Sequence, residues 1–224
     1  NMLKEHLSTH NGIPTKIVVL HHHVIPIPWT GKERNVLSNA GDLLELFLRS
    51  DVDLVLSGHK HYPNSYQIES TVFVNAGTVS DEKTRYGDTN SYNLIEIDDD
   101  TTTIQVKRDN GHVKAETYDR SKKRVFTNFG SRVARLGQIS NTFISNSDSF
   151  RSKTFEDGVS HLNHFDPDLV VHTGGVVEEA IPSNYRLARE LLANIEPPIM
   201  FTPASRDINY LGYQLFSKNF GEMD

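Results

Sequence analysis

The sequence predicts an α/β fold in which parallel β-α-β units accompany an antiparallel meander. Two apolar runs, at residues 16–20 and 54–56, are separated by a segment of helical periodicity, which is typical of a β-α-β unit. The middle of the chain holds closely spaced runs rich in Val, Ile, Tyr and Thr, which are typical of antiparallel strands. With 224 residues, the chain is long enough to bury a sizeable core.

The elements of the first half follow in order. We expect a short helix at 2–7, a strand at 16–21, a helix at 40–50 and a strand at 53–57. A strand–helix–strand succession implies that the two strands are parallel. The meander then comprises runs at 65–69, 72–76, 91–97, 102–107 and 113–118, with a hairpin turn at Asp109-Asn110-Gly111.

A charged stretch at 120–132 lacks periodicity, and we expect it to be a linker with a solvated basic cluster. Its alternative interpretation is a phosphate-binding patch. Beyond it the α/β alternation returns, with a strand at 133–139, a helix at 153–165 and a strand at 168–172. A helix at 183–195 with Ser183 as its N-cap follows, and a further strand begins at Ile199.

Composition limits the function classes. A net charge of −6 argues against a general nucleic-acid-binding surface, although a local basic patch stays open. The chain has no cysteine, so any metal ion must be bound by His, Asp, Glu or Asn. No apolar run reaches the length of a membrane span and no signal peptide is visible, so we expect a cytoplasmic protein without a membrane partner. Because the chain begins in what reads as the end of a helix, it is expected to be a fragment of a longer protein.

Histidines follow two of the predicted strands. His59 and His61 come after the strand at 53–57 and the small-residue turn Ser57-Gly58. In an extended segment, residues i and i+2 point to the same side, so these two imidazoles are expected to face one point. The strand at 16–21 ends in His21, His22 and His23. Two strands ending in imidazoles predict a metal site, whereas either motif alone is equally compatible with a polar loop.

These motifs resemble those of the calcineurin-like metallophosphoesterases. Residues 18–22 (Val-Val-Leu-His-His) are similar to the family's strand-to-histidine motif, 58–61 to its Gly-His-x-His motif, and 74–78 to the strand and turn that follow. The resemblance implies a metallophosphoesterase-like sandwich and hydrolysis of phosphate mono- or diesters. It implies two divalent metal ions (Mn, Fe or Zn), with His21, His59 and His61 as ligands. On this basis residues 1–125 correspond to the C-terminal-type half of the family domain.

Residues 133–224 resemble the N-terminal-type half of the same domain, but with its metal ligands lost. The family's Asp-x-His is here Asn141-Thr142-Phe143, and its Gly-Asp is Gly174-Gly175. Its Gly-Asn-His-Asp is Ala204-Ser205-Arg206-Asp207. Two divalent ions need anionic ligands to offset their desolvation, so we do not expect this half to build a dinuclear centre.

Several interpretations stay open. The chain is either a fragment of a tandem protein, which we favour because domains usually fold from contiguous chain, or a permuted or swapped domain completed by its two halves. A phosphoesterase acting on a phosphate ester is the leading function, although activity of this chain alone is doubtful. A catalytically inactive binding or assembly module is the alternative, with self-association or a complementary domain as its partner. A nuclease would need a basic face.

The remaining candidate side chains are assigned supporting roles. His22 and His23 are expected to support the ligands or to belong to the loop. The three imidazoles of His21, His59 and His61 can also bind a single zinc ion, but the resemblance implies that they are divided between two metal ions. His172 is expected to be a hydrogen-bonded histidine at a strand end rather than a ligand. Asp207 is expected to be structural, capping the turn that follows it.

Overall fold

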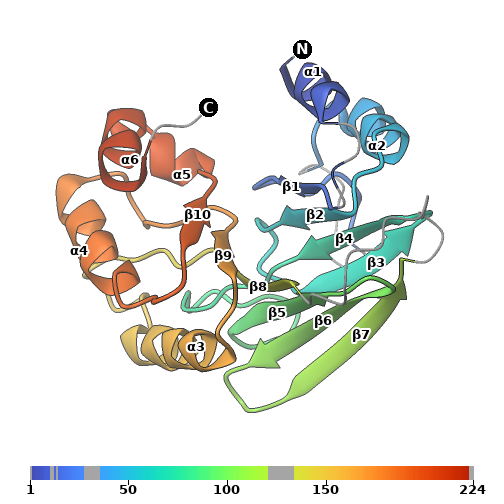
Figure 1. Ribbon diagram of the computed structural model, residues 1–224. Helices are drawn as coiled ribbons and strands as arrows, with labels where there is room; N and C mark the ends of the chain where they lie inside the picture. Colours follow the sequence, from blue (N-terminus) through green and yellow to red (C-terminus); the bar gives the residue numbers. More distant parts are fainter. Residues whose placement is uncertain (1, 11–12, 14, 28–35, 121–133, 222–224) are drawn as a thin grey trace.

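A computed structural model describes residues 2–10, 13, 15–27, 36–120 and 134–221. Its strands form two sheets that pack face to face, with helices on both outer sides (Figure 1). The fold is therefore a mixed α/β sandwich, as the sequence predicts. No helix in the described ranges is both long and apolar enough to cross a membrane.

The first sheet belongs entirely to the first half of the chain and has the strand order β1-β2-β4-β3. β1, β2 and β4 are parallel and β3 pairs antiparallel with β4. The helices α1 and α2 cover its outer face, where Phe47 is fully buried. The bounds are α1 Met2–Thr9, β1 Ile17–Val19, α2 Ala40–Arg49, β2 Leu54–Ser57, β3 Asn64–Ile68 and β4 Thr71–Asn75.

The second sheet is built from both halves of the chain, in the order β10-β9-β8-β5-β6-β7. β5 pairs antiparallel with β8, and β8, β9 and β10 are mutually parallel. The strand bounds are β5 Ser91–Ile97, β6 Thr101–Arg108, β7 Val113–Asp119, β8 Ala134–Ile139, β9 Leu169–His172 and β10 Ile199–Phe201. The helices of the second half are α3 Ser152–Phe165, α4 Pro182–Leu192, α5 Ser205–Ile208 and α6 Gly212–Phe220.

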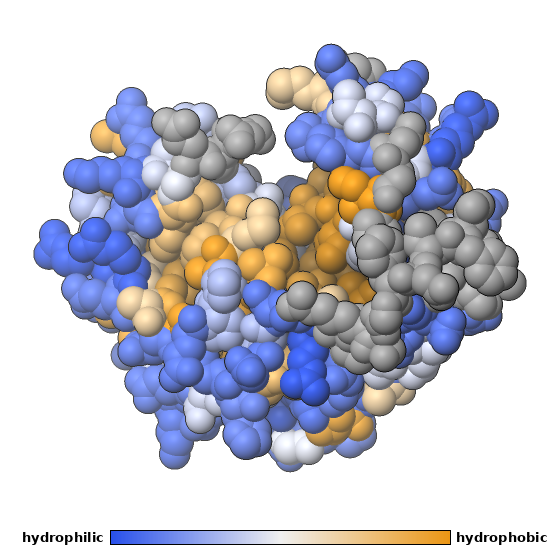
Figure 2. All heavy atoms as spheres, in the orientation of Figure 1, coloured by the Kyte–Doolittle hydropathy of each residue, from blue (hydrophilic) through white to orange (hydrophobic). Residues whose placement is uncertain are grey.

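The core has one apolar layer between the sheets and one under each set of helices. Leu54 and Leu56 of the first sheet meet Ile95 and Ile104 of the second in the central layer. α3, α4 and α6 pack on the outer face of the second sheet. β1 and β10 stand at the ends of their sheets, and Figure 2 shows apolar side chains gathered in the hollow between them.

Three sequence-based expectations need correction. The five strands of the predicted meander do not form one sheet, because β4 pairs with β2 and only β5, β6 and β7 form the meander. Ser183 is not the N-cap of α4, since the N-cap is Ile181. Pro182 occupies the first turn, where its lack of a backbone N–H leaves one donor fewer to satisfy. α5 and α6 were not predicted. Most of the charged stretch at 120–132 lies outside the described residues.

Candidate metal centre

Parallel pairing of β1 and β2 brings their two histidine loops together. Val19 is in register with Leu56, and the pairing continues past both strands through a hydrogen bond from Leu20 N to Leu56 O. The amide of Gly58 then donates to the carbonyl oxygen of His21 at 3.0 Å. The imidazoles that follow each strand are therefore delivered to the same edge of the sheet.

The turn after β2 differs from the extended segment that the sequence suggested. His59 and His61 both have left-handed backbone conformations, with φ values of 71° and 55°. Gly58 is not required for a positive φ. A Cβ atom there would overlap with Ser140 Oγ and lie 3.0 Å from Thr173 Oγ1, so glycine permits close contact with the second half of the chain.

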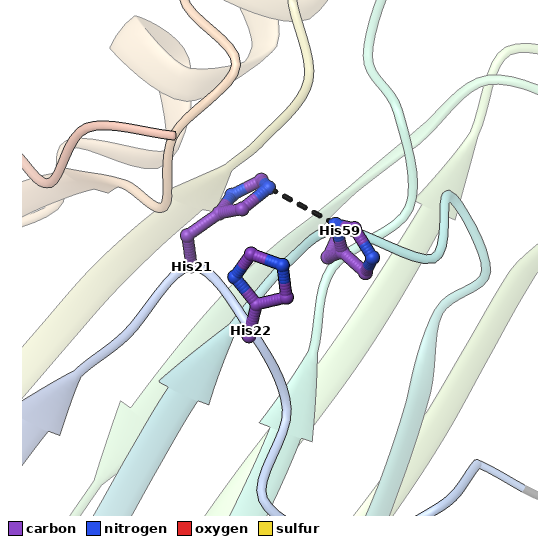
Figure 3. Close-up of side chains that lie close together, drawn as sticks. All are labelled: His21, His22 and His59. Atoms are coloured by element: carbon purple, nitrogen blue, oxygen red, sulfur yellow. Dashed lines mark hydrogen bonds between the residues drawn. The ribbon is translucent and has the colours of Figure 1, made fainter. Parts of the chain in front are cut away.

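Three imidazoles converge at this edge (Figure 3). One ligand-capable nitrogen from each of His21, His22 and His59 lies within 4.8 Å of the others. His21 Nε2 is 3.3 Å from His59 Nδ1, and the ring centroids of His22 and His59 are 4.1 Å apart. The sequence motifs predict only a supporting role for His22, because the family resemblance implies that His21 is the ligand of the triplet.

The cluster favours neutral imidazoles, which is the form that binds metal ions. Burial, together with the smaller effect of the neighbouring histidines, lowers the pKa of His21 to about 4 and that of His59 to about 3. The carbonyl oxygen of Thr173 lies 2.7 Å from His21 Nδ1. Nδ1 therefore carries the proton and Nε2 is left as the acceptor that faces His59. His23 is buried beside the cluster, and its Nδ1 has no hydrogen-bond partner.

His61 is not one of the three clustered imidazoles. Its Nδ1 lies 3.0 Å from the carbonyl oxygen of Lys83 and 3.5 Å from Asp81 Oδ2. Its ring faces that of Phe143, at a centroid distance of 5.3 Å. Burial lowers the pKa of His61, while Lys83 and Asp81 raise it. The structure thus brings together His21 and His59 of the three expected ligands and leaves His61 beside an apolar side chain.

The second half of the chain places Asn141, Phe143 and Arg206 near these histidines. A Cβ at Gly175 would lie 2.9 Å from Asn141 Oδ1 and 2.9 Å from Phe143 Cε1, so the three positions are in contact. The guanidinium of Arg206 lies over the Phe143 ring, 5.0 Å from its centroid. These side chains offer one neutral amide, one apolar ring and one cation. The Asn141 Oδ1 atom is buried without a hydrogen-bond partner.

Two further polar side chains near the site, those of Asp207 and His172, have hydrogen-bond partners at each of their polar atoms. Asp207 accepts hydrogen bonds from the amides of Gly175, Val176, Val177 and Ala204, so it fixes the loop after β9 rather than the turn that follows it. Burial raises the pKa of its carboxyl, whereas these amides favour the charged form. His172 engages Thr142 Oγ1 through Nε2 and the amide of Gly174 through Nδ1. Neither side chain has a free atom for a metal ion.

Among the described residues, the clustered donors suffice for one metal ion. Three neutral imidazoles are a suitable donor set for a single divalent ion with an open position. A second ion beside His61 would meet Phe143 and the positive charge of Arg206. Among the described residues no carboxylate joins the imidazole cluster, so the anionic ligands that two adjacent ions need are missing there.

Comparison with known protein families finds a match to the part of the chain that carries both histidine motifs. A family model described as the calcineurin-like phosphoesterase superfamily domain matches residues 4–100. Residues 4–100 of this chain are therefore similar to the domain of that superfamily. That match includes β1, β2 and both histidine loops, as the sequence motifs imply. None of the curated proteins compared with the chain matches it.

Three solved structures are similar to parts of the chain. A predicted phosphoesterase from Streptococcus pneumoniae TIGR4 shares 21% identity over 37% of this chain and 48% of its own, with a TM-score of 0.32. Wild-type Vps29 from Entamoeba histolytica, complexed with Zn²⁺, shares 27% identity over 46% and 54%, with a TM-score of 0.31. GAP50, described as the anchor in the inner membrane complex of Plasmodium, shares 20% identity over 56% and 39%, with a TM-score of 0.33. The chain spans about half the length of the first two.

Proposed function

We propose that this chain is a phosphoesterase-type module that binds one divalent metal ion. By itself it does not hydrolyse phosphate esters by a two-metal mechanism. His21, His22 and His59 would bind the ion, and the carbonyl oxygen of Thr173 would orient His21. Imidazole ligands suit zinc best, with manganese or iron as the other ions implied by the superfamily. Bound there, the ion would provide a Lewis acid.

One observation carries this proposal. The histidine-bearing half keeps an imidazole cluster, while the half packed against it presents Asn141, Phe143, Gly175 and Arg206. We accordingly interpret residues 1–125 as the ligand-bearing half of a domain and residues 133–224 as its degenerate half. The sheet shared through β5 and β8 supports completion of one domain by both. A module of this kind serves in binding or assembly.

Hydrolysis of a phosphate mono- or diester by two metal ions is the second candidate, because the histidine motifs lie in the part of the chain that is similar to a phosphoesterase superfamily domain. It would require carboxylate ligands from outside the described residues. That requirement makes the two candidates separable by experiment.

The experiment combines metal analysis with an activity assay. The protein is dialysed against Zn²⁺ or Mn²⁺, its metal content is measured, and hydrolysis of bis(p-nitrophenyl) phosphate is followed. We expect one ion per chain and no turnover above that of the His21→Ala/His59→Ala variant. Two ions per chain with turnover that this variant loses would refute the proposal and establish the hydrolase.

A further inference from the structure

A groove with an apolar floor and a basic rim separates α4 from α6, on the outer side of the second sheet (Figure 1). It encloses a cavity of about 200 Å³, and its floor and its three cations are formed by Tyr185, Leu215, Arg186, Arg189 and Lys218. Tyr185 is 1% exposed, and its hydroxyl donates to the carbonyl oxygens of Asp207 and Gly212. The aromatic ring is therefore fixed at the base of the groove, while the three cations are exposed along its rim.

The charge of this groove is not compensated by the described part of the chain. No carboxylate lines the groove, and none of its three cations has an ion pair among the described residues. Glu190 is one helical turn from Arg186 on α4, yet the two form no ion pair, whereas Arg108 pairs with Asp88 at 2.6 Å. Since the whole chain has a net charge of −6, the positive charge is a local feature that favours an anionic ligand.

Exposed apolar side chains adjoin the groove where the two helices begin. A Cβ at Gly212 would lie 2.7 Å from Ala180 Cβ, so the first turn of α6 packs against the segment that leads into α4. The residues that follow these two, Tyr213 and Ile181, are 54% and 42% exposed. Pro182, which follows Ile181, lines the groove itself. Exposed apolar and aromatic side chains beside charged ones are typical of protein-binding surfaces.

We infer that the groove between α4 and α6 binds an acidic segment of a partner protein, in which apolar side chains lie next to carboxylates. Guanidinium groups bind carboxylates through paired N–H donors, and the apolar floor and the exposed Tyr213 accommodate apolar side chains. A free phosphate ion would leave the apolar floor without a contact, and a nucleic acid would need a more extended basic surface. The inference goes beyond the module proposed above and does not depend on its metal ion, because none of the three clustered histidines lines the groove.

A peptide array followed by fluorescence anisotropy tests this inference. The array varies the positions of Asp and Glu among Leu and Phe in short peptides, and the tightest binder is labelled with fluorescein and titrated with the protein. Its neutral counterpart, with Asn and Gln in place of the acids, is titrated in parallel. The variants are Arg186→Gln/Arg189→Gln, Lys218→Gln, Tyr213→Ser and Lys153→Gln. Lys153 is an exposed lysine of α3 and provides the matched control for Lys218.

We expect saturable binding of the acidic peptide that Arg186→Gln/Arg189→Gln weakens about tenfold, since two charge-assisted contacts are lost. Lys218→Gln and Tyr213→Ser should each weaken it about threefold, and Lys153→Gln should bind like the wild type. Circular dichroism confirms that each variant is folded. Chelator-treated and zinc-loaded protein should bind the peptide equally, so failure of the metal proposal is recognised separately from the zinc content.

Several outcomes would overturn the inference. These are the absence of saturable binding by any peptide, equal binding of the neutral counterpart, and a loss in Lys153→Gln as large as in the groove variants. Displacement of the peptide by inorganic phosphate, or by phosphatidylserine vesicles or a single-stranded oligonucleotide that bind more tightly than the peptide, would also overturn it. A small anion, a lipid surface or a nucleic acid would then be the ligand of the groove.

Discussion

At the scale of single residues, the direction in which each histidine leaves the turn decides the composition of the site. His59 faces His21 and His22, whereas His61 faces Phe143. The sequence predicts that imidazoles follow the two strands, since apolar runs and turn residues are local signals. It does not predict the positive φ values of His59 and His61, nor the close approach of the distant residues Ser140 and Thr173 to Gly58.

Single alanine substitutions distinguish the two histidines of the turn. We expect His59→Ala to weaken zinc binding by at least about 100-fold, because it removes one of three imidazoles. His61→Ala should keep the zinc affinity of the wild type within about threefold, and competition with a chromophoric chelator measures both. Equal losses in the two variants would show that His61 is a ligand as well.

The buried histidine of β9 makes stability dependent on pH. Burial lowers the pKa of His172 to about 3, so its ring stays neutral in the folded protein while the unfolded chain takes up a proton near pH 6.5. Its contribution is complete above pH 6.5 and is lost as the pH falls from 6.5 toward 3. Over this range, uptake of one proton by the unfolded chain lowers the free energy of unfolding by about 1.4 kcal/mol for each pH unit.

Urea unfolding at pH 7 and pH 5 measures this effect. His172→Gln should reduce the loss of unfolding free energy between these pH values by about 2 kcal/mol relative to the wild type. His6→Gln, at an exposed position of α1, should leave that loss unchanged. An identical pH dependence of the wild type and His172→Gln would contradict the neutral ring.

At the scale of elements, the loop after β9 leaves no free space for a side chain at Gly175. Asp207 fixes the loop through the amides of Gly175, Val176 and Val177. Gly175 has a φ of +73° and packs directly on Asn141 and Phe143. The sequence predicts the loss of the carboxylate but not that neighbouring side chains occupy its place, because packing across the sheet is a tertiary property.

Two glycines with the same backbone angle separate strain from crowding. Gly87 also has a φ of +73°, but nothing lies within 4 Å of the position of its Cβ. Both Gly→Ala substitutions incur the cost of a left-handed alanine, and only Gly175→Ala adds an overlap. We expect Gly175→Ala to lower the unfolding free energy by about 1–3 kcal/mol more than Gly87→Ala in denaturant titrations. Equal costs would mean that the loop has room for a side chain.

At the scale of the whole molecule, the two halves share one sheet and one polar interface. β5 and β8 pair along five residues, and the Gln138 side chain donates to the carbonyl oxygen of Ser57. Thr78 and Ser80 donate through their hydroxyls to the backbone of residues 141 and 142. Strand and helix positions are largely predictable from local patterns, but the pairing of β5 with β8 is not. It joins strands whose sequence gives no register signal across the junction.

Separate expression of the two halves tests whether they complete each other. Residues 1–120 and 134–224 produced together as two chains are expected to copurify as a one-to-one pair, because β5 would otherwise leave an unpaired edge and an open core. Light scattering after gel filtration measures the stoichiometry. Two halves that fold and migrate separately would instead support independent pieces of a tandem protein.

X-ray absorption at the zinc edge of the zinc-loaded protein tests the central claim most directly. We predict a single zinc environment with three imidazole nitrogens at about 2.0–2.1 Å, which His59→Ala reduces to two. A metal–metal distance of about 3.5–4 Å together with carboxylate oxygens would contradict the claim, because it would reveal a two-metal centre, whereas no carboxylate of the described residues belongs to the imidazole cluster.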